Sequence, residues 1–267
     1  MMTGTARFLA LILMLAPMSL CGGQNKEFEW PNGAKAAVNL AYDDALDSHL
    51  DIAIPALERY GFRGSFYLVM SRESVSKRLG EWRAAASRGH ELGNHTLYHQ
   101  CSASEPDRGW VQPWRDLDRV PSAELVEDIR VASAFLHAID GRTERTFTAP
   151  CGEVEAGGEN YIESIMPDFL AIKAGPGGVQ PAMETLDPYA VGVAAPVGVS
   201  GEELIAMVQE AAARGTMANF TFHGVGGDYL SVSAEAHEQL LQHLAAHPEI
   251  YWVDTFVNIM RYVRGRK

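Results

Sequence analysis

Short apolar runs alternate with longer amphipathic segments along the chain from residue 34 onward. The apolar runs are rich in β-branched and aromatic residues, which is typical of buried strands. They predict eight strands, at residues 36–44, 64–70, 90–96, 145–150, 169–175, 189–197, 219–224 and 250–256. Segments of helical period lie between them, at residues 45–61, 72–89, 122–141, 201–215 and 233–249. Such alternation predicts βα units around a parallel sheet.

The predicted helices carry recognisable end signals. Gly61 follows the first one as a C-cap, and Ser200 with Glu203 forms the pattern of a capping box before a later one. No internal repeat and no Pro/Ser-rich linker divides the chain. We therefore expect a single α/β domain, a (β/α) barrel of seven to eight strands, in preference to an open sheet with a second domain.

Composition limits the choice of partner. The chain has 267 residues, of which 47% are hydrophobic, so it can bury a substantial core. Its 22 basic and 34 acidic residues give a formal net charge of -12, and no basic block stands out. Nucleic acid is therefore not expected as a partner, and a neutral substrate is easier to accommodate than a polyanionic one.

Residues 1–23 predict an export signal. Arg7 precedes the apolar run FLALILMLAPMSLC, which is short for a membrane span and ends before the polar GGQNKEF. Cys21 offers a lipoprotein acceptor as an alternative, although Leu20 stands where that signal normally has a small residue. We expect a catalytic domain at residues 24–267, periplasmic or secreted, with no membrane span.

Candidate chemistry gathers directly after the predicted strands. The residues there are Asp43, Asp44, His95, His99, Pro150, Cys151 and His223. In a (β/α) barrel the carboxyl ends of the strands meet at one mouth, so these side chains should converge. Two histidines four positions apart can bind one ion, and a cation lowers the cost of burying adjacent carboxylates. Each signal also has an ordinary alternative, since acids after strands cap helices and paired histidines occur by chance.

Taken in order, four segments resemble the motifs of a known family. AYDDA, HELGNHTLYH, TFTAPCG and FTFHG are similar to the successive motifs of the polysaccharide deacetylases, carbohydrate esterase family 4. The resemblance covers residues 34 to 263 and implies a distorted (β/α) barrel. It also implies an exported hydrolase that removes O- or N-acetyl groups from a carbohydrate polymer or oligosaccharide.

The resemblance implies a role for each site residue. Asp44, His95 and His99 would bind a divalent metal, usually zinc-like in this family, with open positions for water or substrate. Asp43 would be the general base for a water that the metal activates, and His223 the general acid for the leaving group. Pro150 and Cys151 would form the oxyanion loop, where the Cys151 N–H helps to stabilise the developing charge.

Three positions depart from the family pattern. Thr148 stands where the family has an Arg that tunes the catalytic Asp, and Lys173 is the nearest candidate to replace that cation. Asp187 is a poor match for the fourth-motif Asp that positions the catalytic His. Ala45 replaces a Gly at the end of the first motif. The tuning of base and acid is therefore where this chain is expected to differ.

The connection at residues 101–120 carries Trp110 and Trp114, which would stack on sugar rings or pack the loop onto the barrel. Cys101 and Cys151 are the two cysteines beyond the signal. They pair beside the metal site in one hypothesis and stay free thiols in the other.

Two other functions stay open. The first is an amidohydrolase of a small amide substrate, against which the export signal argues. The second is a carbohydrate-binding barrel with impaired turnover, which the missing Arg favours and the complete set of ligands, base and acid opposes.

Overall fold

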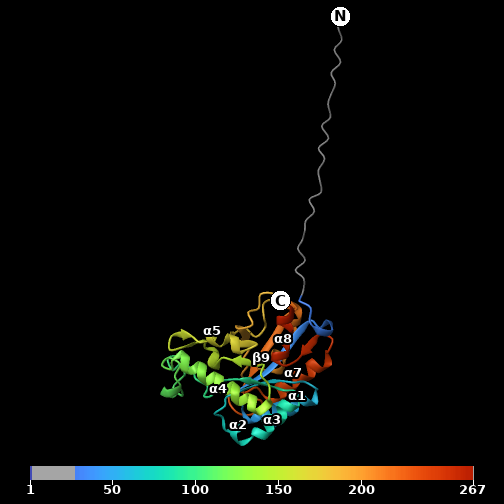
Figure 1. The fold of residues 1–267 in the computed structure, drawn as a ribbon. Helices are drawn as coiled ribbons and strands as arrows, with labels where there is room; N and C mark the ends of the chain where they lie inside the picture. The colour runs from blue at the N-terminus through green and yellow to red at the C-terminus, as the bar shows by residue number, and fades with distance from the viewer. Residues whose placement is uncertain (2–27, 267) are drawn as a thin grey trace.

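Parallel strands form a nearly closed barrel in this computed structural model, which describes Met1 and residues 28–266 (Figure 1). The strands of the main sheet are β1 (Ala36–Asp43), β2 (Ser65–Leu68), β3 (Glu91–Asn94), β4 (Thr146–Thr148), β7 (Ala171–Pro176), β8 (Val191–Val193), β9 (Met217–Phe222) and β10 (Tyr251–Val253). All their pairings are parallel. The predicted barrel of seven to eight strands in a single domain is confirmed.

The barrel is distorted at two places around β1 and β9. One edge of β1 pairs with β9, whereas β10 and β2 share the other edge, at Ala36–Val38 and Ala41–Asp43 respectively. Between β8 and β9 the ring closes through a single parallel bridge, from Ala194 to Phe220. Eight strands are therefore present, but β10 pairs only with the first three residues of β1.

Helices cover the strands on the outside, as Figure 1 shows around β9. They are α1 (Ile54–Arg59), α2 (Glu73–Lys77), α3 (Leu79–Ser87), α4 (Ser122–Asp140), α5 (Ile162–Ile165), α6 (Gly201–Arg214), α7 (Ala234–Ala246) and α8 (Phe256–Arg266). A π-helical turn at His49–Ala53 precedes α1. The predicted capping box at Ser200 and Glu203 is present at the start of α6. Among the described helices, none combines the length and apolar character that a membrane span needs.

Two local features differ from the predicted elements. The segment 72–89 contains two helices, because Arg78 leaves helical geometry (φ -120°, ψ 27°) and its guanidinium binds Asp47, Asp51 and Glu81. A short antiparallel hairpin, β5 (Glu155–Ala156) and β6 (Glu159–Asn160), lies after β4 and was not predicted. Two-residue strands carry too few positions for a periodic pattern.

The core consists of three apolar clusters around the sheet. All eight residues of β1 are buried, which is why its sequence is a nearly continuous apolar run. In the largest cluster the Tyr42 and Phe66 rings stack with centroids 4.8 Å apart, and Trp82 packs on Phe66. A second cluster joins α8 to the sheet, and a third joins α4 and α5 to β4.

Gly93 is required by the packing of its neighbour in the sheet. It pairs in register with Tyr67, and a Cβ at position 93 would overlap the Tyr67 ring. That ring is fully buried and fixed by a 2.8 Å hydrogen bond between its hydroxyl and Thr146 Oγ1, so it has no room to move. The strand that leads to the histidines therefore needs glycine for close packing, not for an unusual backbone conformation.

We expect Gly93→Ala to lower the free energy of unfolding by about 1–3 kcal/mol, because it overpacks a core that has no free space. Gly80→Ala is the control, since a Cβ there meets nothing within 4 Å in α3. The control should be neutral or stabilising by up to about 1 kcal/mol. Urea unfolding of both variants measures the difference, and equal stabilities would contradict the packing argument.

Candidate active site

The polar residues at the strand ends surround one cavity of about 1150 Å³. Asp43 ends β1, and Asp44 follows it directly. His95 follows β3 directly, and His223 follows β9 directly. These residues line the cavity together with His99 and Cys151, so the structure brings the ligand, base and acid candidates to one mouth.

Asp44, His95 and His99 form the tightest group. Asp44 Oδ1 lies 3.1 Å from His99 Nε2 and 3.4 Å from His95 Nε2, and their candidate ligand atoms all lie within 4.8 Å of one another. All three side chains are largely withdrawn from solvent.

The contacts of the two Nδ1 atoms influence which tautomer each imidazole adopts. His95 Nδ1 donates to the Thr148 carbonyl at 2.8 Å, which leaves a lone pair on Nε2. His99 Nδ1 lies 3.6 Å from Cys101 Sγ, a disulfide sulfur without a proton to donate, and its Nε2 lies 3.1 Å from Asp44 Oδ1. The Nε2 atoms of both rings therefore face a buried carboxylate oxygen that has no hydrogen-bond partner. This arrangement fits a divalent cation placed among the three atoms.

The pKa shifts of Asp44 and His99 suit the same interpretation. Burial would raise the pKa of Asp44, but the His99 and His95 imidazoles outweigh it and hold this pKa well below the usual range. Burial lowers the pKa of His99 to about 4. Burial also opposes the charge on His95, yet the Asp43 and Asp44 carboxylates raise the pKa of that ring. The charged Asp44 and neutral His99 are the forms that ligate metals.

Asp43 is paired with a buried lysine from another strand. Lys173 is fully buried in β7, and its Nζ lies 3.7 Å from Asp43 Oδ1 and 4.1 Å from the centre of the Tyr67 ring. Lys173 pairs in register with Thr148, the position where the related motif has Arg. Burial lowers the pKa of Lys173, while Asp43 favours its charged form. A cation thus reaches the Asp43 carboxylate from the adjacent strand.

His223 lacks the carboxylate expected behind it. Its Nε2 lies 3.9 Å from Asp44 Oδ2, but its Nδ1 is buried without a hydrogen-bond partner. Asp187 instead accepts the Tyr189 N–H at 2.9 Å, in the turn before β8. His223 is held through its own backbone, because His49 Nε2 donates to the His223 carbonyl at 2.9 Å.

The site also includes three residues that were not predicted from the sequence: Tyr229, Arg72 and His49. Tyr229 donates its hydroxyl hydrogen to Asp44 Oδ2 at 2.6 Å, and Arg72 donates to the Tyr229 oxygen. Arg72 Nη2 also lies 3.9 Å from Asp44 Oδ2. The GGDY turn just after the His223 strand was a signal for Tyr229, whereas nothing in the sequence around Arg72 or His49 marks them.

Several site residues have left-handed backbones that favour glycine. The φ angles of Asp44, Ala45, His99 and Cys151 are 83°, 52°, 56° and 58°. Ala45, where the resembling family has Gly, therefore adopts this conformation at a steric cost. Such residues concentrate at functional sites, where the surrounding structure enforces them.

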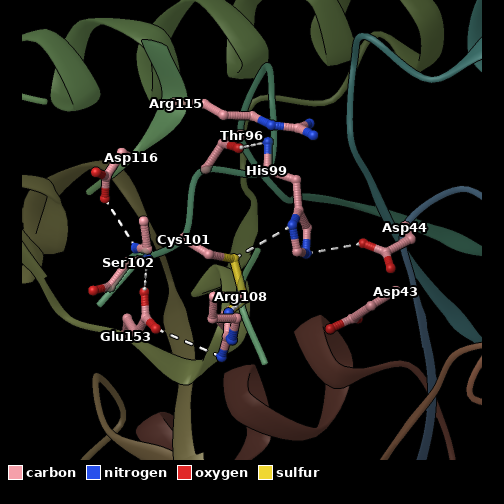
Figure 2. The surroundings of a disulfide bond; sticks show 12 residues. Asp43, Asp44, Thr96, His99, Cys101, Ser102, Arg108, Arg115, Asp116 and Glu153 are labelled. Atoms are coloured by element: carbon pink, nitrogen blue, oxygen red, sulfur yellow. Dashed lines mark hydrogen bonds and ion pairs between the residues drawn. A yellow bond between two sulfur atoms is a disulfide. The ribbon is translucent and has the colours of Figure 1, made fainter. Parts of the chain in front are cut away.

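Cys101 and Cys151 form a disulfide beside the ligand loop, as Figure 2 shows. The bond ties the segment after His99 to the turn Pro150–Gly152, and Arg108 donates to Cys151 Sγ. The two sulfurs and His99 also lie close enough to one another to bind a single metal ion, but sulfurs joined in a disulfide offer no thiolate ligand. The cysteines therefore position loops here.

The connection after the disulfide is anchored at its base. The Ser102 N–H donates to Glu153 Oε2 at 2.7 Å, and the Ala103 N–H donates to Asp116 Oδ1 at 2.9 Å (Figure 2). Trp110 lines the cavity and is 45% exposed, whereas Trp114 is 59% exposed and lies outside it. Pro150 is buried behind the turn and does not line the cavity.

Residues 31–164 match the sequence pattern of a family described as polysaccharide deacetylase. This segment is half of the chain and includes both aspartates, both histidine ligand candidates and the Pro-Cys turn. The chain belongs to the polysaccharide deacetylase family. Among curated proteins, this deacetylase-family chain is 27% identical over 135 residues to a gellan lyase from Bacillus sp. That match covers 50% of this chain but only 5% of the relative's length.

Solved structures share the barrel of this polysaccharide deacetylase family member. The Xyl-CE4 domain of a multidomain xylanase from the hindgut metagenome of Trinervitermes trinervoides is 17% identical, with a TM-score of 0.57 over 86% of this chain and 91% of that one. Peptidoglycan deacetylase PdaC from Bacillus subtilis is 17% identical, with a TM-score of 0.55 over 86% and 92%. A family 4 acetyl xylan esterase from Clostridium thermocellum, in complex with cobalt, is 18% identical, with a TM-score of 0.53 over 86% and 92%. Identities this low establish the fold.

We expect no titratable thiol from Cys101 or Cys151 in the non-reduced protein, and a loss of about 2–4 kcal/mol of unfolding free energy in the double variant Cys101→Ser/Cys151→Ser. The disulfide closes a loop across 50 residues of sequence and so restricts the unfolded chain. Thiol titration and urea unfolding provide the two measurements, and reduced wild type serves as the control. Two free thiols before reduction would refute the bond.

Proposed function

We propose that the protein is a metal-dependent hydrolase that removes acetyl groups from a carbohydrate chain. The main support is the cluster of Asp44, His95 and His99, whose candidate ligand atoms lie within 4.8 Å of one another around a buried carboxylate oxygen without a hydrogen-bond partner. Family membership supports the same reaction class.

Asp44, His95 and His99 are the proposed ligands, with Tyr229 and Arg72 binding the second Asp44 oxygen. When bound, a divalent cation would polarise the acetyl carbonyl and make a water molecule more acidic.

The chain's own residues then have distinct proposed roles. Asp43 accepts a proton from the attacking water, and the Lys173 ammonium beside it holds the buried carboxylate in place. The Cys151 N–H donates to the oxygen on which negative charge develops. His223 donates a proton to the departing alcohol or amine, although no carboxylate orients its ring.

We also propose that the protein acts outside the cytoplasm. The export signal expected at residues 1–23 and the lipidation alternative at Cys21 concern a segment outside the described residues, so both stay predictions. A disulfide beside the site supports this placement, because disulfides persist in oxidising compartments.

Metal content and acetate release test the function together. We expect about one divalent metal per chain and acetate release from acetylated xylan, chitin oligomers or peptidoglycan. His95→Ala should lose the metal and lower acetate release by more than about 100-fold, because an imidazole that binds the metal directly contributes at least as much to its affinity as the groups that orient the ring. His137→Ala, an exposed histidine in α4, is the matched control.

Bound metal without acetate from any polymer would overturn the deacetylase. Turnover of small amides would then indicate the amidohydrolase, and polymer binding without turnover would indicate the impaired barrel.

Lys173→Gln should lower kcat by about 10- to 100-fold, because the Asp43 carboxylate loses the ammonium that lies 3.7 Å from its Oδ1 and holds it in place. Lys173→Arg should restore part of the activity. Lys77→Gln, at an exposed ion pair with Glu73, controls for the loss of one positive charge. An unchanged kcat with a lower free energy of unfolding would show that Lys173 contributes to stability alone.

A further inference from the structure

A tryptophan between two arginines forms one wall of the cavity. The guanidinium carbons of Arg108 and Arg115 each lie 5.8 Å from the centre of the Trp110 ring. The same ring lies 6.2 Å from that of His99, one of the proposed metal ligands. All three residues line the cavity, so this wall borders the position where the acetylated sugar would lie.

The charge on this wall is not matched by nearby acids. Arg108 has a partial partner in Glu153, whose Oε1 lies 3.6 Å from Nη2. Arg115 has no carboxylate within 4.0 Å among residues 28–266. Within the described part of the chain, Asp43 and Asp44 are the only acidic residues that line the cavity, and they already have Lys173 and the imidazoles as partners. The wall is therefore cationic although the whole chain is acidic.

Aromatic contacts hold Arg115 in place without neutralising it. Its guanidinium carbon lies 5.6 Å from the Trp114 ring centre, and Nη1 donates to the Tyr98 carbonyl at 3.5 Å. Its Nε is buried without a hydrogen-bond partner. Figure 2 shows the side chain reaching over the turn that carries Thr96 and His99. A cation fixed in this way loses little conformational entropy when it binds an anion.

We propose that Trp110, Arg108 and Arg115 form a subsite for a carboxylate-bearing sugar next to the acetylated one. This inference rests on the proposed deacetylase function and specifies its substrate as an acidic saccharide. Trp110 holds both guanidiniums at the cavity wall, and these planar groups bind the carboxylate with paired hydrogen bonds. The carboxylate belongs to a uronic acid or to a carboxylated substituent of a peptidoglycan strand.

An acetylated glucuronic-acid-containing polymer and its carboxyl-reduced form are the matched substrates. Wild type should prefer the carboxylated polymer in kcat/KM, mainly through a lower KM, and added salt should weaken that preference. Arg115→Gln should reduce the preference about tenfold, the usual contribution of a hydrogen bond to a charged group. Arg115→Lys should retain part of it, and Arg119→Gln, an exposed arginine on the same connection, should retain all of it.

Peptidoglycan forms the second substrate arm. Arg115 dependence on the glucuronic polymer supports a uronic acid, and dependence on peptidoglycan alone supports the substituent. Equal kcat/KM for the carboxylated and reduced polymers, with no Arg115 dependence on either arm, would overturn the subsite while leaving the deacetylase intact.

If no acetate is released, measurements of oligosaccharide binding distinguish failure of the carboxylate subsite from failure of the deacetylase function. Metal-free protein should bind acetylated glucuronic oligosaccharides more tightly than their carboxyl-reduced forms, and Arg115→Gln should remove about tenfold of that difference in Kd. Such binding without acetate release would support the subsite and overturn the proposed function. Equal Kd values for both oligosaccharides would overturn the subsite whatever the activity.

Discussion

Burial of two adjacent carboxylates at the end of β1 is the constraint on which the site depends. Removing an ionised carboxylate from water costs several kcal/mol unless a partner compensates it. Lys173 lies beside Asp43, and imidazoles with the Tyr229 hydroxyl surround Asp44. These partners come from β7, from the segment after β3 and from the segment after β9, so the barrel must place three strand ends correctly before the carboxylates can stay charged.

The loops at the carboxyl ends of the strands are also closely constrained. The disulfide joins the segment after His99 to the turn at Cys151. His99 and Cys151 both have left-handed backbones. Each such conformation costs free energy that the surrounding contacts must supply. The bond also fixes the start of the connection that carries Trp110, and thereby links the proposed ligands to the proposed sugar-binding wall.

Total charge and local charge point in opposite directions in this protein. The net charge of -12 favours a neutral substrate, yet arginines line one side of the cavity and the acids there are already paired. Surface acids act through water and salt, which screen them over roughly 10 Å, whereas groups inside a cleft are screened far less. The residues within reach of the substrate therefore matter more than the sum over the chain.

The sequence by itself determined the order of strands and helices, the barrel, the family and the strand-end positions of the candidate site residues. These follow from local pattern, because buried parallel strands must be apolar and their polar ends must meet at one mouth. Only the tertiary structure decided which groups compensate each carboxylate. Lys173 reaches Asp43 because its strand lies in register beside Thr148, and Tyr229 reaches Asp44 across 185 residues of sequence. Register and loop path set these contacts, and neither leaves a periodic signal in the chain.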